Sequence, residues 1–335
     1  MRRGTFSKAS LCLCLLTATL VTAPAWAQPP GGRWIFGDWQ VKIPFGERQM
    51  DVILSFAPAG EGVWAGQWIS AWGMNELKDV QFEDGKLTFV HVARFGDDEY
   101  TSTFKGTIEE DKLTGVLSGE QGDADVTGRR SPRISPAAGR WEMKYTLGDR
   151  EVTSVLAVTP DAEGRLGAKW ESRWGEHEIT DFSVERRTIR FRRKSKIQDR
   201  QWESTFEGTL QGDGLTGTVK SEMGDVEVKG VRLGAAAIGT WNLDVTGEWG
   251  TVKQRLLVHP DMTGLYGTIP VKKIELEDGK LTFGLVVPFG DDEFTMDFAG
   301  KIDDTKLAGQ MTTSRGSQEI KGVKVVRRGR RPGNM

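Results

Sequence analysis

Three copies of one unit follow one another along the chain, and this repetition limits the fold more than any other feature. Each copy opens on Gly-x-Trp, continues to a strand-like segment with a central Phe, and has a second Phe fifteen residues further on. We therefore expect three tandem domains of the same fold, at residues 37–130, 139–232 and 239–326, joined by linkers at 131–138 and 233–238. The equivalent landmarks are Trp39, Trp141 and Trp241, then Phe89, Phe191 and Phe283, then Phe104, Phe206 and Phe298.

Inside each unit, apolar residues alternate with polar ones. In the segment KLTFVHVARF at 86–95, Leu87, Phe89 and His91 share one face. This period of two, bounded by Gly and Asp turns, is typical of β-strands that are half-buried on one side. Glycine contributes 42 of 335 residues, well above its usual share of about 7%. We predict an all-β chain with about eight short antiparallel strands in each unit.

The pentapeptide FGDDE occurs at residues 95–99 and again at 289–293. We interpret it as a duplicated hairpin turn and not as a calcium site, because the second unit has QDRQ there and an EF-hand-like site needs more oxygen ligands at set spacing. A four-residue turn then sets the strand register and places a large ring over a cross-strand glycine, a packing arrangement used in designed sheets. The predicted pairs are Phe89 with Gly106, Phe191 with Gly208 and Phe283 with Gly300.

The third unit is shorter than the others. It lacks eight residues, which correspond to WISAWGMN in the first unit and WESRWGEH in the second. We interpret the Trp-Gly pair in these segments as the tip of a hairpin that is clipped in the third copy. On this interpretation, Trp170 and Trp174 overhang the rim of the second unit.

The first 27 residues have the features of a secretory signal peptide. They have a basic start, an apolar run at 11–21 and the small-x-small sequence AWA, so we predict cleavage near Ala27 and a secreted or periplasmic protein. No later apolar run approaches the roughly 20 residues of a membrane-spanning helix, and we expect none. Cys12 and Cys14 both lie in this leader, which leaves the mature chain without disulfide or thiolate chemistry.

The charge balance gives no reason to expect a nucleic-acid partner, since the formal net charge is −2. Two segments are nevertheless basic. The tail RRGRRPGNM at 327–335 is predicted to be disordered and suited to contacts with anionic surfaces. In RRTIRFRRKSK at 186–196, the outward positions form a charged stripe that is either a solvated face or an edge strand protected from aggregation by charge. The stripe consists of Arg190, Arg192, Lys194 and Lys196.

The units resemble the calycin barrels, that is, the lipocalin- and avidin-type proteins. The resemblance is carried by the openings GRWEMKYTLG and GTWNLDVTGEWGTVKQRLLVHPDMTGLYGT. The units are also similar to small barrel modules attached to secreted bacterial hydrolases. The resemblance implies a closed up-and-down antiparallel barrel with a small-molecule cup at one end, usually without catalysis. In these families the opening Trp is structural, and the resemblance identifies no ligand-binding residue on this chain.

No motif in the sequence predicts a reaction. The Gly-x-Ser-x-Gly nucleophile elbow and the phosphate-binding loop are both absent. His91, His177 and His259 occupy different positions in the repeats and have no partner at zinc-site spacing, so we predict neither a metal nor a cofactor. A pair of catalytic carboxylates for glycoside hydrolysis stays open, because the distance between acidic residues cannot be read from sequence.

One inward position differs in chemical type between the copies, being His91, Arg193 or Leu285. An inward Arg is costly unless it is paired or reaches water. Two interpretations follow: Arg193 extends out to solvent, or it forms a cup with tryptophans that binds a carboxylate, phosphate or sugar. The candidate ligand-binding residues are Arg193, Trp202, Ser204, Trp170, Trp174, His91 and Tyr100.

The function expected from these features is that of an exported, non-enzymatic binding or interaction protein with a small anionic or sugar-like ligand. One alternative is a secreted hydrolase that acts on sugars or related small molecules through carboxylates at a barrel mouth. Another is a structural protein of the cell envelope that uses the repeats as spacers. The absence of a repeated catalytic set favours the first and the last of these.

Overall fold

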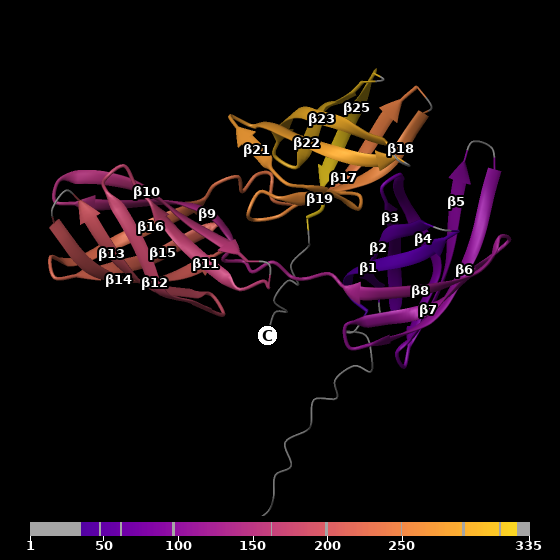
Figure 1. The fold of residues 1–335 in the computed structure, drawn as a ribbon, viewed down its shortest axis with the longest axis horizontal. Helices are drawn as coiled ribbons and strands as arrows, with labels where there is room; N and C mark the ends of the chain where they lie inside the picture. The colour runs from indigo at the N-terminus through magenta and orange to yellow at the C-terminus, as the bar shows by residue number, and fades with distance from the viewer. Residues whose placement is uncertain are drawn as a thin grey trace, which may run out of the picture.

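The computed structural model describes residues 35–46, 48–60, 62–95, 98–161, 163–197, 200–248, 250–289, 292–314 and 316–326. Over these residues the chain is all-β, and its strands form three antiparallel sheets, one for each repeat. Figure 1 shows three separate barrels, with the third between the other two. The predicted fold of three tandem small barrels is therefore confirmed. The leader and the basic tail lie outside the described residues, within which no helix has the length and apolar character needed to cross a membrane.

Barrel 1 is a closed up-and-down barrel of eight strands. Each strand pairs with the next along the chain, and the first pairs with the last to close the sheet. Its strands are β1 (Gly37–Phe45), β2 (Arg48–Gly60), β3 (Val63–Ser70), β4 (Gly73–Glu83), β5 (Lys86–Phe95), β6 (Asp98–Glu109), β7 (Lys112–Gly119) and β8 (Gly122–Arg130).

Barrel 2 has the same strand order but is open at one seam. Its first and last strands pair, whereas β11 and β12 form the two ends of the sheet. The corresponding strands of barrel 1, β3 and β4, are hydrogen-bonded to each other. The strands of barrel 2 are β9 (Gly139–Leu147), β10 (Arg150–Pro160), β11 (Leu166–Glu171), β12 (Glu176–Glu185), β13 (Thr188–Ile197), β14 (Arg200–Gln211), β15 (Gly214–Ser221) and β16 (Gly224–Arg232).

Barrel 3 contains the predicted clipped hairpin, formed by two strands of three residues each. Tyr266 pairs with Leu256 as Trp170 pairs with Leu156, so Tyr266 occupies the position of Trp170. Trp170 itself is only 4% exposed, which corrects the expectation that it overhangs the rim. The strands are β17 (Gly239–Gly247), β18 (Gly250–Val258), β19 (Gly264–Tyr266), β20 (Ile269–Val271), β21 (Ile274–Glu277), β22 (Lys280–Phe289), β23 (Asp292–Asp303), β24 (Lys306–Thr313) and β25 (Gly316–Lys324).

The predicted hairpin register is wrong by two residues. Phe95 pairs with Asp98, so β5 and β6 are joined by a two-residue turn instead of a four-residue one, a common hairpin loop. The turn residues, 96–97 and 290–291, lie outside the described residues. As a result, each Phe that was predicted to face a glycine faces the second Phe of its unit, and the two rings stack. The ring centroids lie 4.8 Å apart for Phe89 and Phe104, 4.9 Å for Phe191 and Phe206, and 4.8 Å for Phe283 and Phe298.

Rings do lie over glycines, but they are different rings. A Cβ atom built on Gly106 would lie 2.5 Å from Cζ of Phe104, and one built on Gly115 would lie 2.6 Å from the same atom. The ring of Phe104 therefore covers a glycine on its own strand and one on the next strand. This close approach requires glycine, because any side chain at these positions would overlap the ring.

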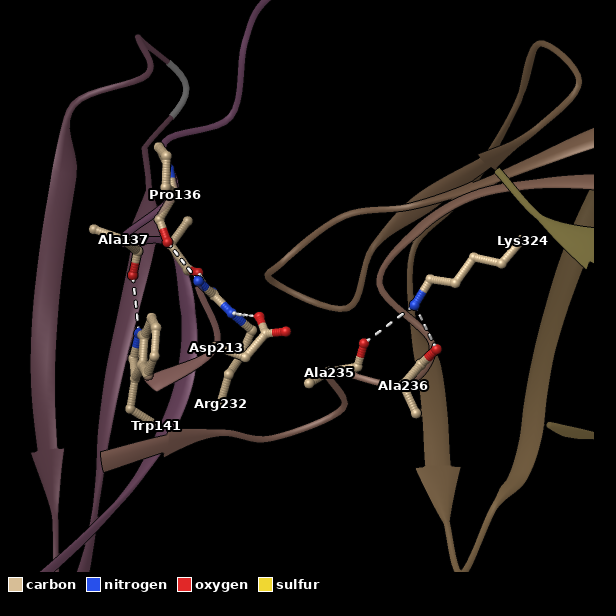
Figure 2. A network of polar contacts seen from close by, with 9 residues as sticks. Pro136, Ala137, Trp141, Asp213, Arg232, Ala235, Ala236 and Lys324 are labelled. Carbon is tan, nitrogen blue, oxygen red and sulfur yellow. Dashed lines mark hydrogen bonds and ion pairs between the residues drawn. The ribbon is translucent and has the colours of Figure 1, made fainter. Parts of the chain in front are cut away.

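A Trp and a cation close one end of each barrel. In barrel 2, Nε1 of Trp141 donates to the carbonyl of Ala137 at 3.0 Å, and the guanidinium of Arg232 lies 4.0 Å from the centre of the Trp141 ring (Figure 2). Arg232 also donates to the carbonyls of Pro136 and Ala138. In barrel 3, Lys324 takes the place of the Arg and donates to the carbonyls of Ala235 and Ala236 (Figure 2).

These contacts correct the interpretation of residues 131–138 and 233–238 as linkers. Ala137 and Ala237 are fully buried in the cores of barrels 2 and 3. Each segment is therefore a lid over the end of the barrel that follows it. The opening glycines explain the entry from lid to strand, since Gly139 has φ +121° and Gly239 has φ +128°, values that other residues rarely adopt.

Barrel 1 completes barrel 3 where the third hairpin is clipped. Ala71, at the tip between β3 and β4, packs against the core of barrel 3, and Nε2 of Gln254 donates to the carbonyl of Ser70 at 3.2 Å. Gly267, in the clipped hairpin, lies so close to that carbonyl that a Cβ atom would collide with it. The tip of one repeat thus occupies the space left by the missing residues of another.

A buried ion pair reinforces this contact. Arg255 donates through Nη1 to Oδ1 of Asp38 at 3.2 Å, and its Nη2 lies 3.0 Å from Oδ2. The side chain of Arg255 is almost fully buried, and Ser55 also donates to Asp38 at 2.6 Å. Barrels 1 and 3 are therefore docked against each other and are not independent domains.

We expect Asp38→Ala to lower the free energy of unfolding by about 2–3 kcal/mol, because it leaves Arg255 buried without its counter-charge. Chemical unfolding of the full chain measures the loss. The double variant Asp38→Leu with Arg255→Leu should recover most of the stability. Equal losses in the single and double variants would show that the ion pair is not what holds the two barrels together.

Candidate functional site

Arg193 is a buried cation on β13 that points into barrel 2. Its side chain is 8% exposed, and its guanidinium lies 4.5 Å from the centre of the Trp170 ring. Its Nε donates to Oγ of Ser204 at 3.3 Å. This arrangement contradicts the interpretation that Arg193 extends out to solvent. It also differs from the predicted register, because Ser204 and not Phe206 lies opposite Arg193.

Within the described residues, no carboxylate forms an ion pair with Arg193. Burial lowers the pKa of its guanidinium, and a hydrogen bond and charge interaction with Tyr145 offset part of this effect. An arginine side chain stays protonated in proteins even so. Barrel 2 therefore holds a positive charge that the described part of the chain does not neutralise.

Polar side chains surround Arg193 and are hydrogen-bonded in pairs. The hydroxyl of Tyr145 lies 3.2 Å from Oγ of Ser154, and Nδ1 of His177 lies 2.9 Å from Oγ of Ser195. The three serines of this group are buried. We call the set the Arg193 cluster, which consists of Tyr145, Ser154, Trp170, His177, Arg193, Ser195 and Ser204.

Two ring nitrogens of the cluster are buried and have no hydrogen-bond partner, namely Nε1 of Trp170 and Nε2 of His177. The indole nitrogen can only donate. Burial, together with the nearby charge of Arg193, lowers the pKa of His177, and a backbone hydrogen bond with Trp174 offsets part of this effect. An unpartnered buried donor costs about 1–3 kcal/mol, and the cluster is thus short of hydrogen-bond acceptors and of negative charge.

The cluster lies beside the seam of barrel 2. Trp170 is next to the last residue of β11, and His177 is the second residue of β12. The two strands are connected through Trp174, which is 59% exposed. No ladder of backbone hydrogen bonds joins β11 to β12, so strand pairing does not close the barrel on this side.

The equivalent positions of barrel 1 carry a different arrangement. His91 takes the place of Arg193 and stacks on Trp68, with ring centroids 4.0 Å apart and an interplanar angle of 13°. Burial lowers the pKa of His91 to about 4, so it is neutral at pH 7. Ile43 and Val52 replace Tyr145 and Ser154, so these positions of barrel 1 carry no charge.

The equivalent positions of barrel 3 do not form such a cluster either. Leu285 and Met296 stand in the positions of Arg193 and Ser204, and Val245 stands in that of Tyr145. Gln254 replaces Ser154 but is bonded to the tip of barrel 1. Among the described residues, only the second copy combines an inward cation with surrounding donors.

The structure brings together three of the predicted site residues, Arg193, Trp170 and Ser204. Trp202 is half-buried on β14 and pairs with Ser195 at the edge of the cluster. Trp174 lies in the exposed connection, outside the cluster. His91 and Tyr100 belong to barrel 1, where Tyr100 is 39% exposed, so they do not form one site with Arg193 in barrel 2.

Sequence reasoning missed four members of the cluster: Tyr145, Ser154, His177 and Ser195. All four are polar residues at strand positions whose side chains point into the barrel. Three of the four stand where barrel 1 has Ile43, Val52 and Ala93. A comparison of every inward position across the copies, and not of one position alone, is the signal that could have found them.

The basic stripe on the outer face of β13 is a solvated face and not a protected edge. The strand lies between β12 and β14. Three of its four cations pair with acidic residues of the neighbouring segments: Arg190 with Glu207 at 3.0 Å, Arg192 with Asp181 at 3.2 Å and Lys194 with Glu203 at 3.7 Å.

Other chemistries find little support in the described part of the chain. No group of three or more His, Cys, Asp or Glu side chains there is arranged to hold a metal ion. The carboxyl groups of Asp161 and Glu207 have lowered pKa values, because Arg165 and Arg190 donate hydrogen bonds to them. A general acid for glycoside hydrolysis needs the opposite shift.

Comparisons with known proteins identify no family. No family model matches the chain, and no curated protein matches it. Among solved structures, a DUF3598-family protein of unknown function from Nostoc punctiforme is similar at 11% identity and a TM-score of 0.21, over 87% of this chain and 96% of that one. Transferrin binding protein B from Haemophilus parasuis is similar at 10% identity and a TM-score of 0.18, over 87% and 76%. At TM-scores this low, no residue of this chain can be equated with a functional residue of those two proteins.

Proposed function

We propose that this is an exported, non-enzymatic binding protein and that barrel 2 holds a small anionic or sugar-like ligand at the Arg193 cluster. The signal-peptide-like sequence of residues 1–27 supports export. The observation that carries the binding proposal is the buried guanidinium of Arg193, 8% exposed and without a carboxylate partner among the described residues. Burying a charge is costly unless it is paired, and a bound anion would supply the missing partner.

The unpartnered ring nitrogens support the same conclusion. A ligand oxygen can accept from Nε1 of Trp170 and so relieve the cost of leaving this donor buried. On this proposal the other two barrels act as scaffold: in barrel 1 a His stacked on Trp68 takes the place of Arg193, and barrel 3 is docked onto barrel 1. Among the described residues, the positions equivalent to Arg193 are uncharged in barrels 1 and 3, which supports a binding function in the second copy.

We expect tryptophan fluorescence of the mature full-length chain to respond to anionic or sugar ligands, because Trp170 stacks on the charged group that would bind them. Arg193→Leu should abolish the response, with a loss of affinity of about tenfold or more for a charge-assisted contact. The matched control is Arg192→Leu, since Arg192 is the next residue on the strand but faces outward and is exposed.

Circular dichroism and thermal unfolding establish that both variants stay folded. If the response survives Arg193→Leu unchanged, the cluster is not the binding site. If no member of a panel of carboxylates, phosphate esters and sugars changes the fluorescence or the melting temperature of the wild-type chain, the proposal is wrong.

A further inference from the structure

Resting on the proposed function, we infer that the ligand of the Arg193 cluster is a monocarboxylate joined to an apolar or aromatic body. The cluster would hold the carboxylate through Arg193 and Nε1 of Trp170. The rings around the cluster would receive the rest of the molecule. Charge, geometry and the surrounding surface each point to this class.

The charge of the cluster matches a single negative charge. Arg193 is its one cation, because His177 lies beside this guanidinium in a partly buried position that favours the neutral ring. A phosphate monoester carries about −1.5 to −2 at pH 7, and burying it here would leave up to one negative charge without a partner. A monocarboxylate brings the charge of the site to zero.

The geometry suits a planar group with two oxygens. The guanidinium lies over the Trp170 ring at 4.5 Å, its Nε is bonded to Ser204, and it also has a hydrogen bond with Tyr145. Its contacts with a ligand are therefore made in its own plane, through the terminal nitrogens, where a carboxylate fits the fork of N–H groups. The indole nitrogen of Trp170 is a further donor with no other partner.

The surface around these donors is apolar. Trp170 lies between two other rings, 6.2 Å from that of Tyr145 and 6.1 Å from that of Phe191. Ile179 pairs with Arg193 across β12 and β13, and Phe182 packs on the same core. A ligand that is only a head group, such as acetate, would make no contact with these rings, whereas a body of several carbons would gain from burial against them.

Isothermal titration of the mature full-length chain with a matched series tests the class. The series is 3-phenylpropionate, 3-phenylpropan-1-ol, 3-phenylpropyl phosphate and acetate. We expect 3-phenylpropionate to bind about tenfold or more tightly than the alcohol, the phosphate ester and acetate, since each lacks one of the matched features. Arg193→Leu should remove this binding. Trp170→Phe, which keeps a ring but loses the N–H donor, should weaken it by about fivefold to tenfold and leave the barrel folded.

The outcomes separate the two proposals. If the phosphate ester or the alcohol binds more tightly than the carboxylate, and Arg193→Leu abolishes that binding, the cluster is a binding site but the monocarboxylate class is wrong. If Trp170→Phe leaves carboxylate affinity unchanged, the role of the indole donor is wrong. If no compound binds, or Arg193→Leu has no effect on the binding, the proposed function fails and the ligand class fails with it.

Discussion

Replacing Trp141 by Ala is expected to lower the free energy of unfolding of barrel 2 by about 3–5 kcal/mol, the usual cost of truncating a large buried ring. Trp141 is fully buried, and its ring is covered by the guanidinium of Arg232 at 4.0 Å. The variant leaves a cavity at the end of the barrel and removes the hydrogen bond to Ala137 that holds the lid in place. Denaturant unfolding, combined with hydrogen exchange resolved by peptide, measures the effect in barrel 2.

Trp174→Ala is the control, because its side chain is 59% exposed in the same barrel and its loss should change stability by no more than about 0.5 kcal/mol. A loss below about 1 kcal/mol for Trp141→Ala would show that the lid and its Trp are not required for the fold. Similar losses for the two variants would contradict the assignment of Trp141 to the core.

Lowering the pH from 7 to 4 is expected to destabilise barrel 1 by up to about 3 kcal/mol through His91. Burial lowers the pKa of His91 from 6.5 to about 4. Between these values the unfolded chain binds the proton and the folded barrel does not, so stability rises with pH across this window. The neutral His91 ring contributes its full stabilisation above the pKa that His91 has in the unfolded chain. This stabilisation is lost as the pH falls toward 4.

His91→Phe tests this prediction, since it keeps a ring against Trp68 and removes the titrating group. Urea unfolding of both proteins at pH 7 and pH 4 gives the two differences in stability. The loss of stability between pH 7 and pH 4 should be smaller in the variant than in the wild type, by about the amount assigned to His91. An identical loss in the two proteins would show that other groups cause the acid sensitivity.

Local pattern alone predicted the class of fold. Alternation with a period of two is a property of a strand whose one face is buried, and the repeated Gly-x-Trp marks where each barrel starts again. The same phase predicted that Arg193 points inward, which its burial confirms. The register failed because it depends on the length of one turn. Phe95 pairs with Asp98, so every cross-strand partner lies two positions from its predicted place, and Phe89 lies against Phe104.

By itself, the sequence determined the three repeats, their all-β barrels and the inward phase of Arg193, because each of these depends on residues close together in the chain. Only the tertiary structure decided the features that join distant segments. Residues 131–138 became a lid because Trp141 and Arg232 bind their carbonyls, and the tip of barrel 1 filled the clipped side of barrel 3. The Arg193 cluster also joins distant segments of the chain, because its residues come from six strands, β9 to β14. Such contacts depend on strand register and on the closing of a sheet, and neither can be read from one strand alone.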